Sequence, residues 1–129
     1  MTYKFSQRSE NSLVGVNPAL VSVVRRALEL SPVDFIVIEG LRTKARQQQL
    51  KDAGASKTMN SRHLSGNAVD LLPVGADWND HKCWLPVLVA MHQAGQELGV
   101  KLRFGITWTD NPEDKPAKFL DAPHVEIPA

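Results

Sequence analysis

The sequence predicts an α+β fold, in which a small antiparallel or mixed sheet is flanked by helices. Helical and extended patterns follow one another without the strict alternation that is typical of parallel α/β folds. Hydrophobic residues make up 43% of the chain and charged residues 22%, which is ordinary for a globular domain. A length of 129 residues suits one hydrophobic core. We therefore expect a single domain over residues 1–129.

Three elements are expected in the first half of the chain. Asn17 is a suitable N-cap, and Pro18 suits the first position of a helix that ends before Ser31-Pro32. Residues 33–38 are rich in β-branched side chains and predict a buried strand. After a turn at 39–42, a second helix is expected from a Thr43 cap to about residue 52.

The second half predicts alternating loops and elements. Glycine and proline positions and apolar spacing indicate the boundaries of each. In order, we expect a polar loop at 55–62, a strand at 66–72, a helix from near 80 to 98, a short strand at 100–104, a long loop at 105–120 and a last strand at 124–127. A loop of that length in a compact domain often borders a binding site.

Charge and composition exclude several classes of function. The formal net charge is +1, and the densest basic spots, Arg25-Arg26 and residues 42–46, resemble helix surface rather than a nucleic-acid interface. Cys83 is the only cysteine, so no intramolecular disulfide can form. No stretch is long and apolar enough for membrane insertion, and the first residues lack the apolar run of a signal peptide. We expect a monomer.

Two histidines lie near carboxylates at positions that suit a metal site. A catalytic zinc ion takes three protein ligands and leaves one position for water, whose pKa its charge lowers. His63, Asp70 and His124 supply two imidazoles and one carboxylate. The sequence therefore predicts one zinc ion held by these three residues.

A hydrolytic zinc site also needs a proton shuttle and a group that stabilises the oxyanion. Asp121 stands three residues before His124 and could accept a proton from water and pass it to a leaving amine. Arg42, in the turn after a buried strand, is the candidate cation. Alternatively, Arg42 only pairs with Glu39 or caps a helix, and Asp121 forms a simple surface pair with His124.

Three motifs carry a resemblance to a known family. Residues 61–70 match the pattern Ser-x-His-x-x-Gly-x-Ala-x-Asp of the VanY-like D-alanyl-D-alanine peptidases, which share their fold with lysostaphin and hedgehog N-terminal domains. Asp121-x-Pro-His124 is similar to the second half of that site. Residues 39–43 with Arg46-Gln47 resemble the strand-to-helix turn of the family. The resemblance extends from about Pro18 to Ile127.

The resemblance implies a role for each site residue. It makes His63, Asp70 and His124 the zinc ligands and Asp121 the catalytic base and acid. It also makes Arg42 a contact of the substrate carbonyl and Ser61 a residue that lines the substrate site. Dipeptidases of the family commonly carry Glu where this chain has Asp121, and this difference favours the phage endolysin branch, the L-alanyl-D-glutamate peptidases.

The implied function is a phage endolysin that hydrolyses peptidoglycan stem peptides without a separate cell-wall-binding domain. It would be made in the host cytoplasm and reach the periplasmic wall after release by another protein. The alternatives are a D-alanyl-D-alanine carboxypeptidase or dipeptidase, and a zinc-containing binding module without catalysis, against which Asp121 speaks. The roles of Glu126, Trp78 and Trp108 stay open: Glu126 either orients a ligand histidine or is an exposed acid, and each Trp either stacks on substrate or covers the core.

Overall fold

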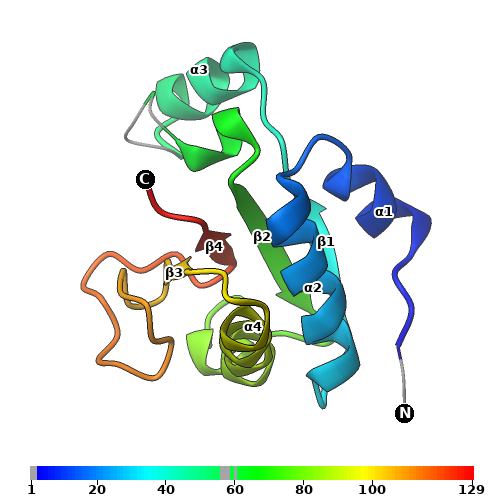
Figure 1. Cartoon of the computed structure of the whole chain (residues 1–129). Coiled ribbons are helices and arrows are strands. Elements are labelled where there is room, and N and C mark those ends of the chain that lie inside the picture. Colours follow the sequence, from blue (N-terminus) through cyan, green and yellow to red (C-terminus); the bar gives the residue numbers. More distant parts are fainter. Residues whose placement is uncertain (1–2, 56–58, 60) are drawn as a thin grey trace.

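The centre of the fold is a four-stranded antiparallel sheet (Figure 1). The computed structural model describes residues 3–55, 59 and 61–129. The strand order is β1 (Phe35–Glu39), β2 (Ala68–Pro73), β4 (His124–Glu126) and β3 (Arg103–Phe104). All three neighbouring pairs run antiparallel. The predicted α+β class is therefore confirmed, with an antiparallel rather than a mixed sheet.

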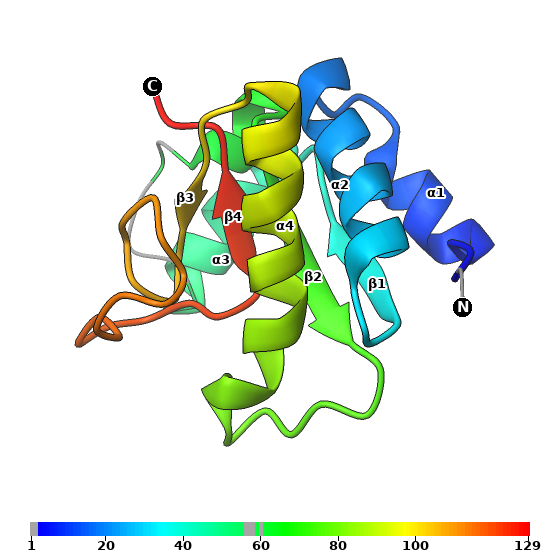
Figure 2. The same ribbon diagram turned by 60° about the horizontal axis from the view of Figure 1, so that its bottom comes forward.

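Two long helices cover one face of this sheet. Helices α2 (Pro18–Leu30) and α4 (Leu85–Leu98) lie side by side against it (Figures 1 and 2). The Asn17 side chain caps α2 by accepting a hydrogen bond from the Ala19 N–H, as the sequence predicts. The apolar stripe of α2 is fully or almost fully buried and consists of Leu20, Val23, Val24, Ala27 and Leu28.

The strands alternate between this core and the opposite face. Val69 and Leu71 on β2, and Val125 on β4, have no solvent exposure and pack in the core cluster with the helices. The intervening Asp70 and His124 are cross-strand partners on the other face. Because side chains alternate along a strand, the sheet separates an apolar face from a polar one.

A β-bulge modifies the alternation on β1. Val37 pairs with Leu71 on the core side, but the register shifts before Glu39, which pairs with Asp70. An extra residue in one strand reverses the face of the residues that follow it. The bulge therefore turns Glu39 onto the polar face instead of the core face that Val37 occupies.

A short helix that the sequence analysis missed closes the edge of the sheet. Helix α1 (Gln7–Leu13) begins after a Ser6 cap that accepts a hydrogen bond from Ser9 N–H. The buried Ser9 hydroxyl in turn accepts a hydrogen bond from Val37 N–H, at 3.0 Å. This contact satisfies a backbone donor that an edge strand would otherwise leave unpaired.

Other elements match the predictions with shifted boundaries. Helix α3 (Lys44–Asp52) starts after Thr43, as expected. A 3-10 turn, η2 (His81–Trp84), precedes α4, and Pro86 lies in the first turn of the α-helix, where proline is tolerated. Strand β3 is shorter than predicted, and much of the predicted loop at 55–62 lies outside the described residues. None of the described helices has the length and hydropathy needed to span a membrane.

Candidate metal centre

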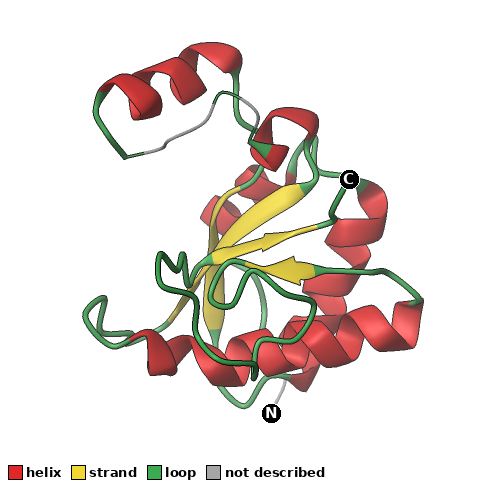
Figure 3. Cartoon of the chain, turned by 90° about the vertical axis from the view of Figure 1, so that its left-hand side faces the viewer, coloured by secondary structure: helices red, strands yellow, loops and turns green. Residues whose placement is uncertain are grey.

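The polar face of the sheet forms the floor of a large cleft. Figure 3 views the molecule from the side on which the 105–120 loop lies in front of the strands. The cleft has a volume of about 1090 Å³. Its walls come from the end of β1, the 3-10 turn η1 (Arg62–Ser65), strands β2 and β4, and the loop at 105–120. All six residues assigned to the site from the sequence line this one cleft: Arg42, Ser61, His63, Asp70, Asp121 and His124.

Three of these residues converge to metal-binding distance. His63 Nε2 lies 3.2 Å from Asp70 Oδ1, and His124 Nδ1 lies 3.5 Å from the same oxygen. One ligand atom from each of the three residues falls within 4.8 Å of the others. His63 is buried in η1, whereas Asp70 and His124 face each other across β2 and β4. Two imidazoles and one carboxylate are a ligand set of catalytic zinc sites.

The remaining nitrogen of each imidazole has a fixed partner. His63 Nδ1 lies 2.8 Å from the Gly40 carbonyl oxygen, and His124 Nε2 lies 2.7 Å from Glu126 Oε1. Both partners only accept hydrogen bonds, so these nitrogens carry the protons. In the neutral form that binds a metal, His63 Nε2 and His124 Nδ1 would each offer a lone pair on the side that faces Asp70. Such anchoring of the outer nitrogen orients metal-ligating histidines, and the donor set therefore fits a zinc ion.

Glu126 is the carboxylate whose role the sequence left open. It is 7% exposed, lies on the same strand face as His124, and accepts the hydrogen bond of that histidine. Burial alone would raise the pKa of Glu126, but the bond from His124 lowers it below its ordinary value. The first alternative, a partner that orients a ligand histidine, is therefore the one that the structure supports.

The shifted pKa values of Asp70 and His124 indicate that this cluster stabilises positive charge. Burial alone would lower the pKa of His124, but hydrogen bonds to Asp70 and Glu126 raise it to about 9. Burial would likewise raise the pKa of Asp70, but its bonds to His124 and His63 hold it well below its usual range. An ionised carboxylate next to a protonated imidazole indicates a position where positive charge is stabilised.

Asp121 lies at the solvent-facing side of the same cleft. Its N–H donates to the Gly105 carbonyl oxygen at 2.8 Å, and its own carbonyl oxygen accepts from His124 N–H at 3.1 Å. Desolvation by the surrounding protein and repulsion from Asp70 raise the pKa of Asp121 above its ordinary value. A raised carboxyl pKa suits a group that accepts and returns protons near neutral pH.

Gly105 is a residue of this site that the sequence analysis did not single out. A Cβ atom at Gly105 would lie 2.3 Å from the Asp121 carbonyl oxygen and 2.9 Å from His124 Cβ. Gly105 N–H donates to the His124 carbonyl oxygen. The absence of a side chain therefore lets the start of the 105–120 loop hold Asp121 and His124 together. A glycine after a short strand was visible in the sequence, but the partner segment was not.

Arg42 lies beside the candidate metal centre with a mostly buried side chain, and its guanidinium already forms hydrogen bonds. Its Nε and Nη2 both reach Glu39 at 2.7 Å, and its Nη1 donates to Gln47 Oε1 at 2.7 Å. Arg42 Nη2 also lies 3.8 Å from Asp70 Oδ2. The alternative that Arg42 pairs with Glu39 is thus confirmed as a contact, and it leaves the guanidinium in a fixed orientation on the wall of the cleft.

Ser61, Trp78 and Trp108 line the cleft and also contact neighbouring parts of the fold. Ser61 caps η1 by accepting a hydrogen bond from His63 N–H, so it helps to fix a ligand histidine. Trp108 packs near His124, with ring centroids 5.5 Å apart. Trp78 is 61% exposed at the rim and contacts the core residue Trp84, with centroids 5.1 Å apart. Trp78 and Trp108, whose roles the sequence left undecided, therefore both line the cleft, and each also contacts a ring of a buried residue.

Comparisons with known proteins agree on one family. The profile of the family described as phage L-alanyl-D-glutamate peptidase matches residues 1–127. The L-alanyl-D-glutamate peptidase of Escherichia phage T5 is 41% identical over 136 residues, covering 98% of this chain and 99% of that protein. The crystal structure of the Serratia marcescens L-Ala D-Glu endopeptidase ChiX superposes with a TM-score of 0.83 at 37% identity, covering 97% of this chain and 90% of that one. The chain belongs to the phage L-alanyl-D-glutamate peptidase family.

Proposed function

We propose that this protein is a zinc-dependent endolysin that hydrolyses the L-alanyl-D-glutamate bond of peptidoglycan stem peptides during phage lysis. The observation that carries the proposal is the convergence of His63, Asp70 and His124 in one cleft with Asp121, in a chain of this family. The phage T5 relative and the endopeptidase ChiX bear names with the same bond specificity.

His63 Nε2, Asp70 Oδ1 and His124 Nδ1 would hold the zinc ion. A zinc ion in such a site supplies Lewis acidity that polarises a carbonyl group and activates water. Gly40 and Glu126 would contribute by accepting the proton of the outer ring nitrogen, so that in each neutral imidazole the nitrogen that faces Asp70 is the one available to the metal. Removal of the metal should therefore abolish hydrolysis while the apolar core, which lies on the other side of the sheet, stays folded.

Asp121 would carry protons in the reaction. It accepts a proton from the attacking water and delivers it to the amine of the departing D-glutamate residue. Its backbone hydrogen bond to Gly105 holds it at the cleft, which its side chain lines. The raised pKa of Asp121 supports this role, because a proton can reside on it transiently.

Arg42 and Ser61 would contribute to substrate binding. The Arg42 guanidinium is held by Glu39 and Gln47, so its positive charge is fixed at the cleft wall before substrate arrives. Such preorganised charge favours the oxyanion that develops on the attacked carbonyl. Ser61, which caps the turn that carries His63, lines the same cleft and would contact the stem peptide.

The proposal extends to the organisation and site of action of the protein. Residues 1–129 would act as one monomeric catalytic domain whose partner is the peptidoglycan stem peptide, without nucleic acid or membrane insertion. The protein would accumulate in the host cytoplasm and act on the periplasmic wall after another protein opens the membrane.

Digestion of purified peptidoglycan tests the proposed bond. The zinc-loaded protein should generate new amino-terminal D-glutamate and carboxy-terminal L-alanine, identified by mass spectrometry of the soluble fragments. A chelator should prevent their release, and added zinc should restore it. Free D-alanine as the sole product would contradict the endopeptidase function and identify a D-alanyl-D-alanine carboxypeptidase instead.

A further inference from the structure

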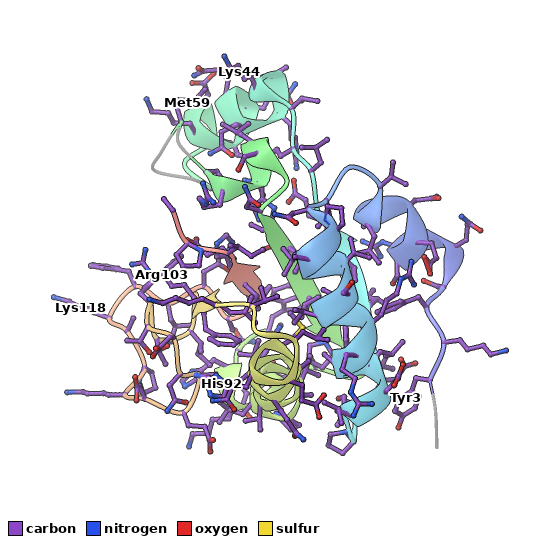
Figure 4. The ribbon with its side chains drawn as sticks, in the orientation of Figure 1. Tyr3, Lys44, Met59, His92, Arg103 and Lys118 are labelled. Carbon is purple, nitrogen blue, oxygen red and sulfur yellow. The ribbon has the colours of Figure 1, made fainter. Side chains whose placement is uncertain are left out.

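A stack of three side chains leads from the metal centre to an exposed arginine. The centroid of the Trp108 ring lies 5.5 Å from that of the His124 ring. The guanidinium carbon of Arg103 lies over the Trp108 ring, 5.2 Å from its centroid. Arg103 is the cross-strand partner of Glu126, so it shares the polar face of the sheet. Figure 4 labels Arg103 on the same side of the molecule as Lys118 of the 105–120 loop.

The backbone holds Trp108 in an unusual conformation. Its φ is +55°, and no other non-glycine residue in the described part of the chain has a positive φ. Its ring nitrogen donates to the Phe119 carbonyl oxygen at 3.0 Å, and its carbonyl oxygen accepts from Arg103 Nε at 3.1 Å. A left-handed backbone costs a bulky residue about 1–2 kcal/mol. Such strain, where observed, is commonly retained at functional positions.

Arg103 differs from Arg42, across the cleft, in its free donors. Arg42 is hydrogen-bonded through three nitrogens to Glu39 and Gln47, and its side chain is mostly buried. Arg103 uses only Nε, and its two terminal nitrogens form no hydrogen bond or ion pair with the described residues. The terminal nitrogens of a guanidinium match the two oxygens of a carboxylate. Arg103 borders both the main cleft and an adjoining groove of about 440 Å³.

The 105–120 loop identifies the part of the substrate that reaches this arginine. Asp121, the proposed donor to the leaving amine, is bonded to Gly105 at the start of the loop that carries Trp108. The residue that departs with its amine therefore lies on this side of the cleft. In the proposed reaction that residue is D-glutamate. It has two carboxyl groups, and continuation of the peptide uses only one of them.

We propose that Arg103, positioned on Trp108, binds the free carboxylate of the D-glutamate residue and makes the enzyme selective for stem peptides in which that carboxylate is not amidated. The inference rests on the proposed function and specifies the substrate of the same site. A charge-assisted bidentate contact forms with the carboxylate, whereas a carboxamide offers one oxygen, no charge and an NH2 group that faces the donors of Arg103.

A matched pair of synthetic muropeptides tests the selectivity. The two peptides carry either a free carboxylate or a carboxamide on D-glutamate, and kcat/KM is measured for the zinc-loaded full chain. The wild type should favour the free carboxylate. Arg103→Gln should lower kcat/KM for that peptide by about 10- to 100-fold and change the value for the carboxamide peptide by less than about threefold. Lys101→Gln removes an equal charge from the adjoining groove and should preserve the selectivity.

Two Trp108 variants test how Arg103 is positioned. Trp108→Phe keeps an aromatic surface under the guanidinium and should retain most of the selectivity. Trp108→Leu removes it and should raise KM for the free-carboxylate peptide more than it lowers kcat. The zinc content of both variants should equal that of the wild type, because Trp108 is outside the ligand set.

The outcomes separate this inference from the proposed function. Wild-type cleavage of both peptides at the L-alanyl-D-glutamate bond, with equal losses for both in Arg103→Gln, would overturn the inference alone. The same holds if Arg103→Gln leaves both values unchanged. Failure of the wild type to cleave that bond in either peptide would overturn the proposed function, and the inference with it.

Discussion

The two faces of strand β2 contribute differently to the molecule. Leu71 points into the core between the sheet and the two long helices, while its neighbour Asp70 lies in the candidate metal centre on the other face. The same alternation separates Val125 from His124 and Glu126 on β4. A strand period of two thus places residues for stability and residues for chemistry next to each other in sequence but on opposite sides of the sheet. Substitutions on the two faces should therefore have separable effects.

The largest effect is expected from Asp121→Asn on the polar face. The change keeps the size of the side chain and the backbone bond to Gly105 but removes the proton acceptor. We expect kcat to fall by about 10²- to 10⁴-fold on defined muropeptides. Zinc content and the midpoint of thermal unfolding should stay at wild-type values. Unchanged turnover would show that another group carries the proton.

The converse effect is expected from Leu71→Ala on the core face. Leu71 has no solvent exposure, and removal of three carbon atoms from such a site lowers the free energy of unfolding by about 2–5 kcal/mol. Urea unfolding followed by circular dichroism measures this change, with Leu71→Met as a control that should cost less than about 1.5 kcal/mol. At a temperature where Leu71→Ala is still folded, it should bind zinc as the wild type does. A loss of zinc affinity without a loss of stability would contradict the separation of the faces.

Glu126 tests how far the metal centre extends beyond its three ligands. Its carboxylate accepts the hydrogen bond from His124 Nε2, and loss of such a partner typically lowers metal affinity by about 10- to 100-fold. Glu126→Ala should show this loss in competition with a zinc chelator. Glu126→Gln, which can still accept the bond, should lose less. Glu97→Gln on helix α4, where an exposed acid pairs with Arg26, is the control and should bind zinc as the wild type does.

The sequence predicted the cluster of candidate ligands better than its surroundings, for a physical reason. His63, Asp70 and His124 are ligand types that stand at the ligand positions of the family motif, and the structure brings them together. Whether Glu126 faces the metal depends on the register of β4 against β2, and register is a property of the folded sheet. The roles of Asp121 and Arg42 stay predictions, although both line the cleft.

The fold shows the same division between local and long-range information. The cap at Asn17, the cap at Thr43 and the glycine after Leu98 are local signals, and each marks a helix end in the structure. The bulge that turns Glu39 towards the metal centre arises from pairing with β2, so no residue of β1 alone specifies it. Gly105 likewise gains its importance only from the approach of Asp121 and His124.

The smallest effect is expected at Asn17, which connects the start of helix α2 to the residue before strand β2. Its side chain accepts from Ala19 N–H at the start of α2 and donates to Asn67 Oδ1 at 2.9 Å, just before β2. Asn17→Ala should lower the free energy of unfolding by about 1 kcal/mol through the lost cap. Asn17→Ser should recover most of that loss, because serine can cap the helix although it cannot reach Asn67 as asparagine does. If Asn17→Ser restores the free energy of unfolding while kcat/KM stays below the wild-type value, then the bond to Asn67 helps to fix β2 in the position that activity needs. If the free energy of unfolding and kcat/KM recover equally, the role of Asn17 is limited to capping helix α2, and the two faces of the sheet act independently.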